Sequence, residues 1–215
     1  MIIAVDGPSA AGKGTIAKAI ATHLGYHFLD TGSLYRMVAL AMLKAGKPAG
    51  DVKSAVGFAE TLEPARVVDK DLRTETVAGM ASEVAAIPAV RQALLEFQRN
   101  FAKREPGAVL DGRDIGTVVC PEADLKFFVT ASTEVRANRR LAELKSLGVK
   151  TDFKAVLEDI WVRDERDAAR TAAPTKQADD AIMIDTSELD RDEVLAAVMG
   201  VIADHMDSQA AASAG

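Results

Sequence analysis

The segment DGPSAAGKGT, residues 6–15, constrains the fold of this chain more than any other stretch of its 215 residues. Gly7 is followed after four residues by Gly12 and Lys13, which is the GxxxxGK spacing of a phosphate-binding loop. The backbone N–H groups of such a loop surround an anion, and the lysine reaches the outer phosphates. The loop follows the apolar run MIIAV and precedes the helical pattern IAKAIATHL, so the helix dipole would also face the phosphates. The expected ligand is a nucleoside triphosphate.

Short apolar runs alternate with helical patterns along the rest of the chain. Strands are expected at 1–5, 27–29, 108–110, 125–129 and 181–184. Helices are expected at about 13–24, 32–45, 51–62, 76–86, 89–104, 132–147, 152–170 and 190–206. Short buried strands that alternate with helices are typical of a parallel sheet joined by crossover helices. The sequence therefore predicts the α/β class, with a P-loop three-layer fold in which helices flank a central parallel sheet.

The long helical stretch between the second and third expected strands predicts a small inserted lobe. We expect a single domain at 1–206, with a core at about 1–45, 106–132 and 171–206, an insert at about 46–105 and a short lid at about 133–170. The last residues, 207–215, are small and polar, and we expect them to be disordered.

Composition and charge exclude several classes of protein. With 48% hydrophobic and 27% charged residues, the chain resembles ordinary globular proteins. Its formal net charge of −6 argues against a nucleic-acid-binding surface. The single cysteine, Cys120, cannot form an intrachain disulfide, which fits a reducing compartment. The opening run MIIAV is too short for a membrane span and has no basic flank of a signal peptide. We therefore expect a cytoplasmic protein with no nucleic-acid or membrane partner, and we take a monomer as the default.

The residue after the lysine departs from the common form of the phosphate loop. A Ser or Thr usually stands there and its hydroxyl ligates Mg²⁺, whereas this chain has Gly14 and places the hydroxyl at Thr15. We interpret Thr15 as a phosphate contact and expect water to hold most of the metal's coordination sphere. Asp111, which ends the expected strand AVL, is either a further metal ligand, directly or through water, or a turn-forming residue.

Arginines gather on two helical faces near the end of the chain. Arg163, Arg166 and Arg170 are spaced by three and four residues, and Arg136 and Arg140 share a face of the preceding helix. One interpretation is a pair of solvated faces with ion pairs to neighbouring acidic residues. The other is a lid that closes over an anion, because a phosphoryl group in transfer supplies the charge that such a cluster needs.

Two polar segments, DTGSLYR and DGRDIGT, follow expected strands, at the edge where ligands bind in open α/β sheets. In the first, Asp30 or Thr31 caps the following helix, and Thr31 could share an anion with Arg36. In the second, Arg113 and Asp114 either pair with each other in a turn or contact a ligand.

Taken together, these segments resemble the bacterial cytidylate kinases, a family of nucleoside monophosphate kinases of the P-loop class. DGPSAAGKGT, LDTGSLYR, RTETVAGMASEVAAIPAVRQALLEFQR, LDGRDIGTVV, ANRR and RDERDAARTAAP match the family's segments in its order, over about residues 2–185. The resemblance implies ATP-dependent phosphorylation of CMP and dCMP to CDP and dCDP, with Mg²⁺, in pyrimidine nucleotide metabolism. It also implies that the insert at 46–105 binds the monophosphate, although the segment between Ala49 and Arg73 is shorter than in some members.

The resemblance further implies a role for each matching residue. The residues implied to read cytosine are Ser82, Arg91 and Asp114. Those implied to hold the acceptor phosphate are Thr31, Arg36, Arg113 and Arg170, and those near the ribose are Arg163 and Asp167. The residues implied to serve the transferring phosphoryl group are Lys13, Arg139, Arg140 and Arg166. The loop implied to bind the ATP phosphates consists of Gly7, Pro8, Ser9, Ala10, Ala11, Gly12, Lys13, Gly14 and Thr15.

Chemistry supports this assignment independently of the resemblance. Cytosine presents an amino donor at N4 and acceptors at N3 and O2, so its reader needs an acceptor such as Asp114 and a donor such as Arg91. Uracil presents O4 in place of the amino group, which a carboxylate would repel. Because the second pKa of a phosphate monoester is near 6, the acceptor oxygen is mostly unprotonated at neutral pH and direct in-line transfer needs no general base.

Two alternatives remain open at this point. The first is a kinase of another small acceptor, such as UMP, AMP or shikimate, and the second is a nucleotide-binding regulatory module without transferase activity. A GTP-hydrolysing switch would need a DxxG segment and an [NT]KxD segment; no aspartate has glycine three residues on, and TKQA has Ala178 in place of the carboxylate.

Overall fold

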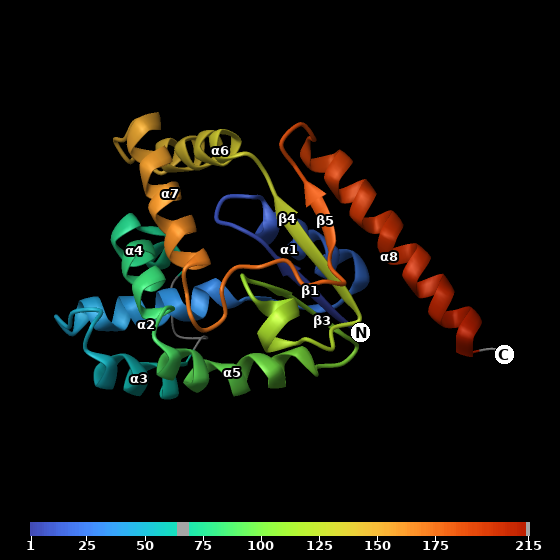
Figure 1. The fold of residues 1–215 in the computed structure, drawn as a ribbon, viewed down its shortest axis with the longest axis horizontal. Helices are drawn as coiled ribbons and strands as arrows, with labels where there is room; N and C mark the ends of the chain where they lie inside the picture. Colours follow the sequence, from blue (N-terminus) through green and yellow to red (C-terminus); the bar gives the residue numbers. More distant parts are fainter. Residues whose placement is uncertain (64–68, 214–215) are drawn as a thin grey trace.

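Figure 1 shows the computed structural model of the chain, which describes residues 1–63 and 69–213. Within these residues, one sheet of parallel strands has the order β2-β3-β1-β4-β5. The strands are β1 (Ile2–Asp6), β2 (His27–Asp30), β3 (Ala108–Asp111), β4 (Leu125–Thr130) and β5 (Ile182–Asp185). Each lies within a residue or so of an expected strand. The predicted α/β class with a parallel sheet is therefore confirmed.

Helices connect the strands and account for most of the remaining chain. They are α1 (Lys13–Leu24), α2 (Thr31–Lys44), α3 (Val52–Glu60), α4 (Glu75–Val84), α5 (Pro88–Ala102), α6 (Thr133–Ser146), α7 (Phe153–Ala168) and α8 (Arg191–Ser213). A 3₁₀ helix, η2 (Asp69–Arg73), and a π-helix, η3 (Ile115–Val119), were not expected from the sequence. No helix in the described part of the chain is both long and apolar enough to cross a membrane.

The two faces of the sheet are covered by different helices. On one face, Ile3 and Phe127 of the sheet pack against Ile20 of α1 and Val198 of α8. On the other face, α5 and η3 pack against β2 and β3, and Cys120 is buried in this layer. The sheet therefore lies between two helical layers, as the three-layer prediction requires.

Two further groups of helices have apolar clusters of their own, away from the sheet (Figure 1). Helices α2, α3, α4 and α5 bury Leu34, Val38 and Leu94 among themselves. Helices α6 and α7 bury Leu144 and Ile160 between them. Helix α2 belongs to the first cluster, so the apolar core that includes the expected insert begins before residue 46. Residues 64–68 of the expected insert lie outside the described residues.

The expectation of a disordered tail at 207–215 is wrong for the residues that the structure describes. Residues 207–213 continue α8, which projects beyond the body of the molecule in Figure 1. Alanine is the strongest helix former, and three of these residues are alanine, so the tail extends a helix that Val198 and Ile202 anchor on the sheet. Residues 214–215 lie outside the described residues.

Four of the strands end in aspartate at the same edge of the sheet. These residues are Asp6, Asp30, Asp111 and Asp185. The register pairs Asp111 with Val5 on one side and with Asp30 on the other, so the ends of β1, β2 and β3 are level. The carboxyl edge of a parallel sheet is where ligands of open α/β proteins bind.

Candidate active site

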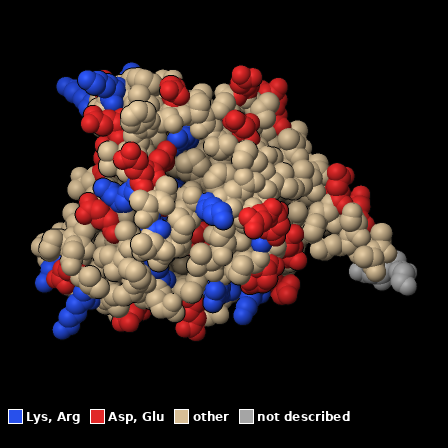
Figure 2. All heavy atoms as spheres, in the orientation of Figure 1, with Lys and Arg blue, Asp and Glu red and all other residues tan. Residues whose placement is uncertain are grey.

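A cleft of about 1230 Å³ lies at this edge of the sheet, between the α2–α5 layer and the helices α6 and α7. Figure 2 shows basic side chains within the hollow that separates α6 and α7 from the body. The P-loop residues that line the cleft are Ser9, Ala10, Gly12, Lys13, Gly14 and Thr15. The cleft is also lined by every residue predicted for the acceptor, namely Thr31, Arg36, Ser82, Arg91, Arg113, Asp114, Arg163, Asp167 and Arg170. Gly7, Pro8 and Ala11 are not among the described residues that line it.

The P-loop at one end of the cleft is held tightly against β4. Gly7 has a φ of 142°, and a Cβ atom there would lie 1.9 Å from the carbonyl oxygen of Val129. Only glycine allows this approach of the two backbones. Lys13, the first residue of α1, is 6% exposed and its Nζ donates to the Pro8 carbonyl at 2.8 Å. Burial lowers the pKa of Lys13 to about 8, and Arg113 adds to this effect.

Gly14 leaves space for a carboxylate beside the lysine. A Cβ atom at Gly14 would lie 3.0 Å from Oδ2 of Asp111, so the usual serine or threonine at this position would crowd that carboxylate. Asp111 is buried, and burial raises its pKa to about 6 while Lys13 opposes the rise. An oxygen donor at the end of β3, facing the start of α1, suits Mg²⁺, which takes one or two protein carboxylates together with phosphates and water.

Guanidinium groups gather around a buried carboxylate in the middle of the cleft. Arg113 Nε donates to Oδ2 of Asp167 at 3.1 Å, and Arg170 pairs with Oδ1 of the same residue. Burial alone would raise the pKa of Asp167, but Arg113 and Arg170 outweigh it and the pKa is lowered. Arg163 has no ion pair among the described residues, and its Nε is buried without a hydrogen-bond partner. Burial, Arg113 and Arg36 lower the pKa of Arg163 to about 10, so the single carboxylate of Asp167 does not balance the positive charge gathered here.

The start of α2 closes the same part of the cleft. Asp30 caps the helix by accepting the Ser33 N–H at 3.1 Å, as one of the two predicted capping residues. Thr31 donates instead to the Asp111 carbonyl at 2.8 Å, and Arg36 donates to the Leu72 carbonyl at 3.2 Å. In the segment DTGSLYR, Asp30 therefore caps α2, while Thr31 and Arg36 line the cleft.

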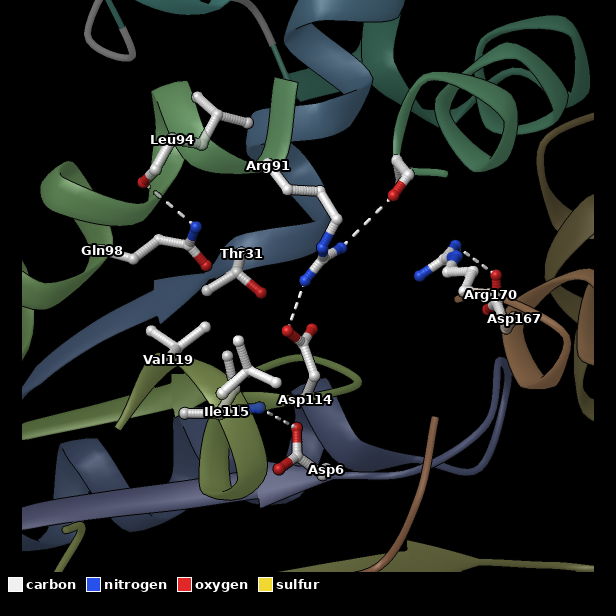
Figure 3. Close-up of polar contacts among 12 residues, drawn as sticks. Asp6, Thr31, Arg91, Leu94, Gln98, Asp114, Ile115, Val119, Asp167 and Arg170 are labelled. Carbon is white, nitrogen blue, oxygen red and sulfur yellow. Dashed lines mark hydrogen bonds and ion pairs between the residues drawn. The ribbon is translucent and has the colours of Figure 1, made fainter. Parts of the chain in front are cut away.

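Arg91 and Asp114 form an ion pair at the other end of the cleft (Figure 3). Arg91 also donates to the Ala85 carbonyl at 3.4 Å, and its Cζ lies 5.5 Å from the centre of the Tyr35 ring. The neighbouring Ser82 hydroxyl is buried and has no hydrogen-bond partner in the described part of the chain. The alternative in which Arg113 and Asp114 pair with each other in a turn is not observed, because each has a different partner.

Helices α6 and α7 place their arginines in different ways. Arg140 lines the cleft and pairs with Glu75 of α4 and, at 2.7 Å, with Glu143. Arg139 is not among the described residues that line the cleft, and it donates to Thr186, to Oγ1 at 2.8 Å and to the carbonyl at 2.7 Å. Arg166 is not among the described residues that line the cleft. Of the three lid arginines expected at the transferring phosphoryl group, the structure therefore brings only Arg140 to the cleft.

Comparison with known sequences decides the family. The sequence model of the Cytidylate kinase family matches residues 3–204. This chain belongs to the cytidylate kinase family. A relative named cytidylate kinase from Rhodopseudomonas palustris is 53% identical over 202 residues, which cover 94% of this chain and 95% of that protein. A second, from Methylocella silvestris, is 51% identical over 208 residues, covering 97% of this chain and 96% of that protein.

Solved structures of other proteins share the fold of this chain. A shikimate kinase from Bacteroides thetaiotaomicron superposes with a TM-score of 0.50 at 16% identity, covering 94% of this chain and 96% of that one. An uncharacterized protein from Eubacterium ventriosum superposes with a TM-score of 0.51 at 15% identity, covering 97% of this chain and 98% of that one. At such identities the likeness shows the fold alone. The predicted P-loop kinase fold and the family resemblance are both confirmed.

Sequence reasoning missed Tyr35, and it missed the contacts that Arg136 makes in the site. Tyr35 lies under Arg91 and lines the cleft. Arg136 is buried, donates to the Ser9 carbonyl at 3.3 Å and pairs with Asp164 at 2.7 Å, so it ties the P-loop to α7. The spacing of Arg136 to Arg140 marked a shared face, but only the folded chain shows that Arg136 contacts the loop's backbone.

Proposed function

We propose that this protein transfers the γ-phosphoryl group of ATP to the phosphate of CMP and dCMP, giving CDP and dCDP in pyrimidine nucleotide metabolism. The observation that carries the proposal is that one cleft has a P-loop at one end and the Arg91–Asp114 pair at the other. Between these ends lie Arg113 and Arg163, the second of which has no carboxylate partner in the described chain. Membership of the cytidylate kinase family supports the same substrate.

The P-loop end is suited to the triphosphate. The backbone of the loop and the N-terminus of α1 favour anions, and Lys13 is held close to the loop by its hydrogen bond to the Pro8 carbonyl. Asp111 and water would hold Mg²⁺ beside Lys13 at the place that Gly14 leaves free. When bound, the ion would neutralise negative charge on the phosphates and help to orient them.

The arginine-rich middle of the cleft is suited to the acceptor phosphate. Arg36, Arg113 and Arg170 approach it from α2, from the end of β3 and from the segment after α7. Their positive charges would hold the acceptor oxygen in line with the γ-phosphorus. Arg163 and Asp167 are one turn apart on α7 and lie beside this position, where the ribose of the acceptor would be bound. The chain needs no general base, because the acceptor oxygen is already ionised.

The far end of the cleft is suited to cytosine. The Asp114 carboxylate would accept a hydrogen bond from N4 of cytosine, and Arg91 would donate one to N3 or O2. These bonds would partly replace the ion pair that the two side chains form with each other. The Ser82 hydroxyl lacks a partner and would gain one from the base.

We further propose that the α2–α5 layer acts as the monophosphate-binding insert and that α6 and α7 act as the lid. Each has a separate apolar cluster, which supports movement of each as a unit. Ion pairs of Arg140 with Glu75 and of Arg73 with Glu143 at 3.9 Å join the two parts in this structure.

A coupled assay of ADP release with CMP, dCMP, UMP, AMP and shikimate in parallel tests the proposal. We expect ADP release with CMP and dCMP and much slower release with UMP. Equal or faster turnover of another acceptor would favour the alternative kinase. ATP binding without ADP release from any acceptor would favour a regulatory module.

Replacing Asp111 by asparagine is expected to raise the Mg²⁺ concentration that gives half-maximal activity by roughly tenfold or more, because a charged oxygen ligand is lost. The measurement is the rate of CDP formation over a Mg²⁺ titration at fixed ATP. Asp204→Asn on α8 is the matched control, since Asp204 is exposed and remote from the cleft. An unchanged Mg²⁺ requirement in Asp111→Asn would remove Asp111 from the proposed metal site.

A further inference from the structure

The base-facing Asp114 is placed by an unusual element, the five-residue π-helix η3. Such helices are rare and occur mostly as single turns, frequently at functional sites. The Asp114 carbonyl accepts the N–H groups of Val118 at 2.9 Å and Val119 at 3.1 Å, so the backbone of Asp114 is part of the turn. The orientation of its carboxylate therefore depends on how η3 is held.

Asp114 stands at the position before the first helical residue, where aspartate usually caps a helix with its own side chain. Its carboxylate makes no such cap here and points instead to Arg91 (Figure 3). The exposed backbone N–H groups of a helix start need an acceptor from somewhere. A second carboxylate supplies it.

Asp6, the last residue of β1, accepts from both of the first two N–H groups of η3. Its Oδ1 accepts from Ile115 at 2.8 Å and its Oδ2 accepts from Gly116 at 2.7 Å. Asp6 is 4% exposed, and a Cβ atom at Gly116 would lie 3.4 Å from its Oδ2 and 3.0 Å from Cδ of Lys126, so the carboxylate lies against the first turn of η3. Figure 3 shows the Asp6 carboxylate beside the Ile115 nitrogen, with Asp114 between Asp6 and Arg91.

The groups around Asp6 act on its carboxyl in opposite directions. Burial raises the pKa of Asp6 to about 7, the two N–H donors favour its ionised form, and the Asp114 charge opposes it. Two carboxylates near the same turn repel each other, so an ionised Asp6 both occupies the N–H groups and disfavours movement of Asp114 towards them. At its other end, η3 is held by Arg99, which donates to the Val119 carbonyl at 3.0 Å and the Val118 carbonyl at 3.1 Å.

We infer that Asp6 is a positioning residue for base recognition: it caps η3 in place of Asp114 and so keeps the Asp114 carboxylate directed at Arg91 and the base. The inference rests on the proposed function, because it concerns how the same site distinguishes cytosine from uracil. It gives Asp6 a role beyond the P-loop that follows it, and this role links the triphosphate end of the cleft to the base end through a single side chain.

The substitution Asp6→Asn tests the inference, because asparagine has the same shape but offers one acceptor and one donor to the two N–H groups. An N–H group is then left for Asp114 to cap. We expect the ratio of kcat/KM for CMP to kcat/KM for UMP to fall by roughly tenfold, within the range of a lost base contact. The loss is expected mainly in KM for CMP, with kcat at saturating CMP changed by less than about threefold.

Two companion variants make the test specific. Asp124→Asn is the matched control, because Asp124 also accepts a backbone N–H, from Ile2 at 2.6 Å, but at the opposite end of β1. We expect its CMP to UMP ratio to equal that of the wild type. In an Asp114→Asn background, Asp6→Asn is expected to cause no further change in the ratio, since the carboxylate that it positions is already absent.

The possible outcomes separate this inference from the proposed function. A wild type that prefers CMP, with an unchanged ratio in Asp6→Asn, overturns the inference and leaves the function intact. Equal losses with CMP and UMP also overturn it, because they would indicate a disturbed P-loop. A wild type that does not phosphorylate CMP overturns the proposed function and the inference with it.

If a thermal unfolding measurement shows that Asp6→Asn is not folded, Arg99→Ala serves in its place. Arg99 is exposed and anchors the far end of η3. Its removal is expected to lower the CMP to UMP ratio in the same direction by a smaller factor, and an unchanged ratio would overturn the inference.

Discussion

Replacing Lys13 by alanine is expected to lower kcat for CDP formation from CMP by roughly 10²- to 10³-fold, the usual effect of removing one preorganised charge partner of a transition state. Lys13 is buried at the start of α1, and its hydrogen bond to the Pro8 carbonyl holds it beside the loop. The lysine charge would follow the phosphoryl group as negative charge develops on its oxygens. Steady-state rates with saturating ATP and CMP measure the effect.

A matched control for this substitution is Lys44→Ala. Lys44 is an exposed lysine at the end of α2 and does not line the cleft. Its removal takes the same charge from the surface and should leave kcat unchanged. A Lys13→Ala enzyme that still forms CDP at the wild-type rate would contradict the assignment of the P-loop as the ATP phosphate site.

Replacing Asp114 by asparagine is expected to narrow or reverse the preference for CMP over UMP. The carboxylate accepts from cytosine N4, whereas an asparagine amide can donate to uracil O4. A well-made base contact is worth about 1 to 3 kcal/mol, so the ratio of kcat/KM for CMP to that for UMP should change by roughly 5- to 150-fold. Parallel assays with the two acceptors measure it.

Arg91→Ala should change the same ratio, and its effect should not add to that of Asp114→Asn because the two side chains are ion-paired. Arg104→Ala is the matched control: Arg104 also lies over an aromatic ring, with its Cζ 4.4 Å from the centre of Phe101, but it does not line the cleft. A ratio that stays constant in both Arg91→Ala and Asp114→Asn would remove this pair from the base site.

The sheet and the P-loop could be predicted closely because their signals are local. Each strand is a short apolar run ending in a polar residue, and the glycine spacing of the loop reflects backbone geometry at positions such as Gly7. The residues of the acceptor site were predicted through the family resemblance, and all of those named for the acceptor line the cleft. From helical periodicity alone, one could predict that these arginines share helix faces, but not which residues they contact.

The features that sequence reasoning missed depend on contacts between distant parts of the chain. The π-helix at 115–119 reads as a short apolar run, and its N-terminal acceptor, Asp6, lies 109 and 110 residues away from the donors. Likewise, spacing places Arg139 and Arg140 on helix α6 but does not say that one meets Thr186 and the other the cleft. Partners of this kind are set by tertiary packing.

The prediction for the C-terminal tail was wrong for a different reason: it relied on amino-acid composition and neglected helix propensity. Small and polar residues suggested disorder, yet alanine-rich segments extend an existing helix readily because only propagation, not nucleation, is required. Helix α8 is already fixed on the sheet by Val194, Val198 and Ile202. Its last turns therefore follow from the packed half of the same helix.

The Arg140 guanidinium, which is proposed to contact the transferring phosphoryl group, already forms ion pairs with Glu75 and Glu143. Any phosphate that reaches this guanidinium must displace carboxylates, so the gain in free energy is the difference between two sets of charge-assisted bonds. Occupation of the cleft at this point is an exchange of anions. The two glutamates hold the guanidinium of Arg140 in one orientation, and in the proposed reaction the loss of the Glu75 contact would remove one of the ion pairs that join α4 to α6.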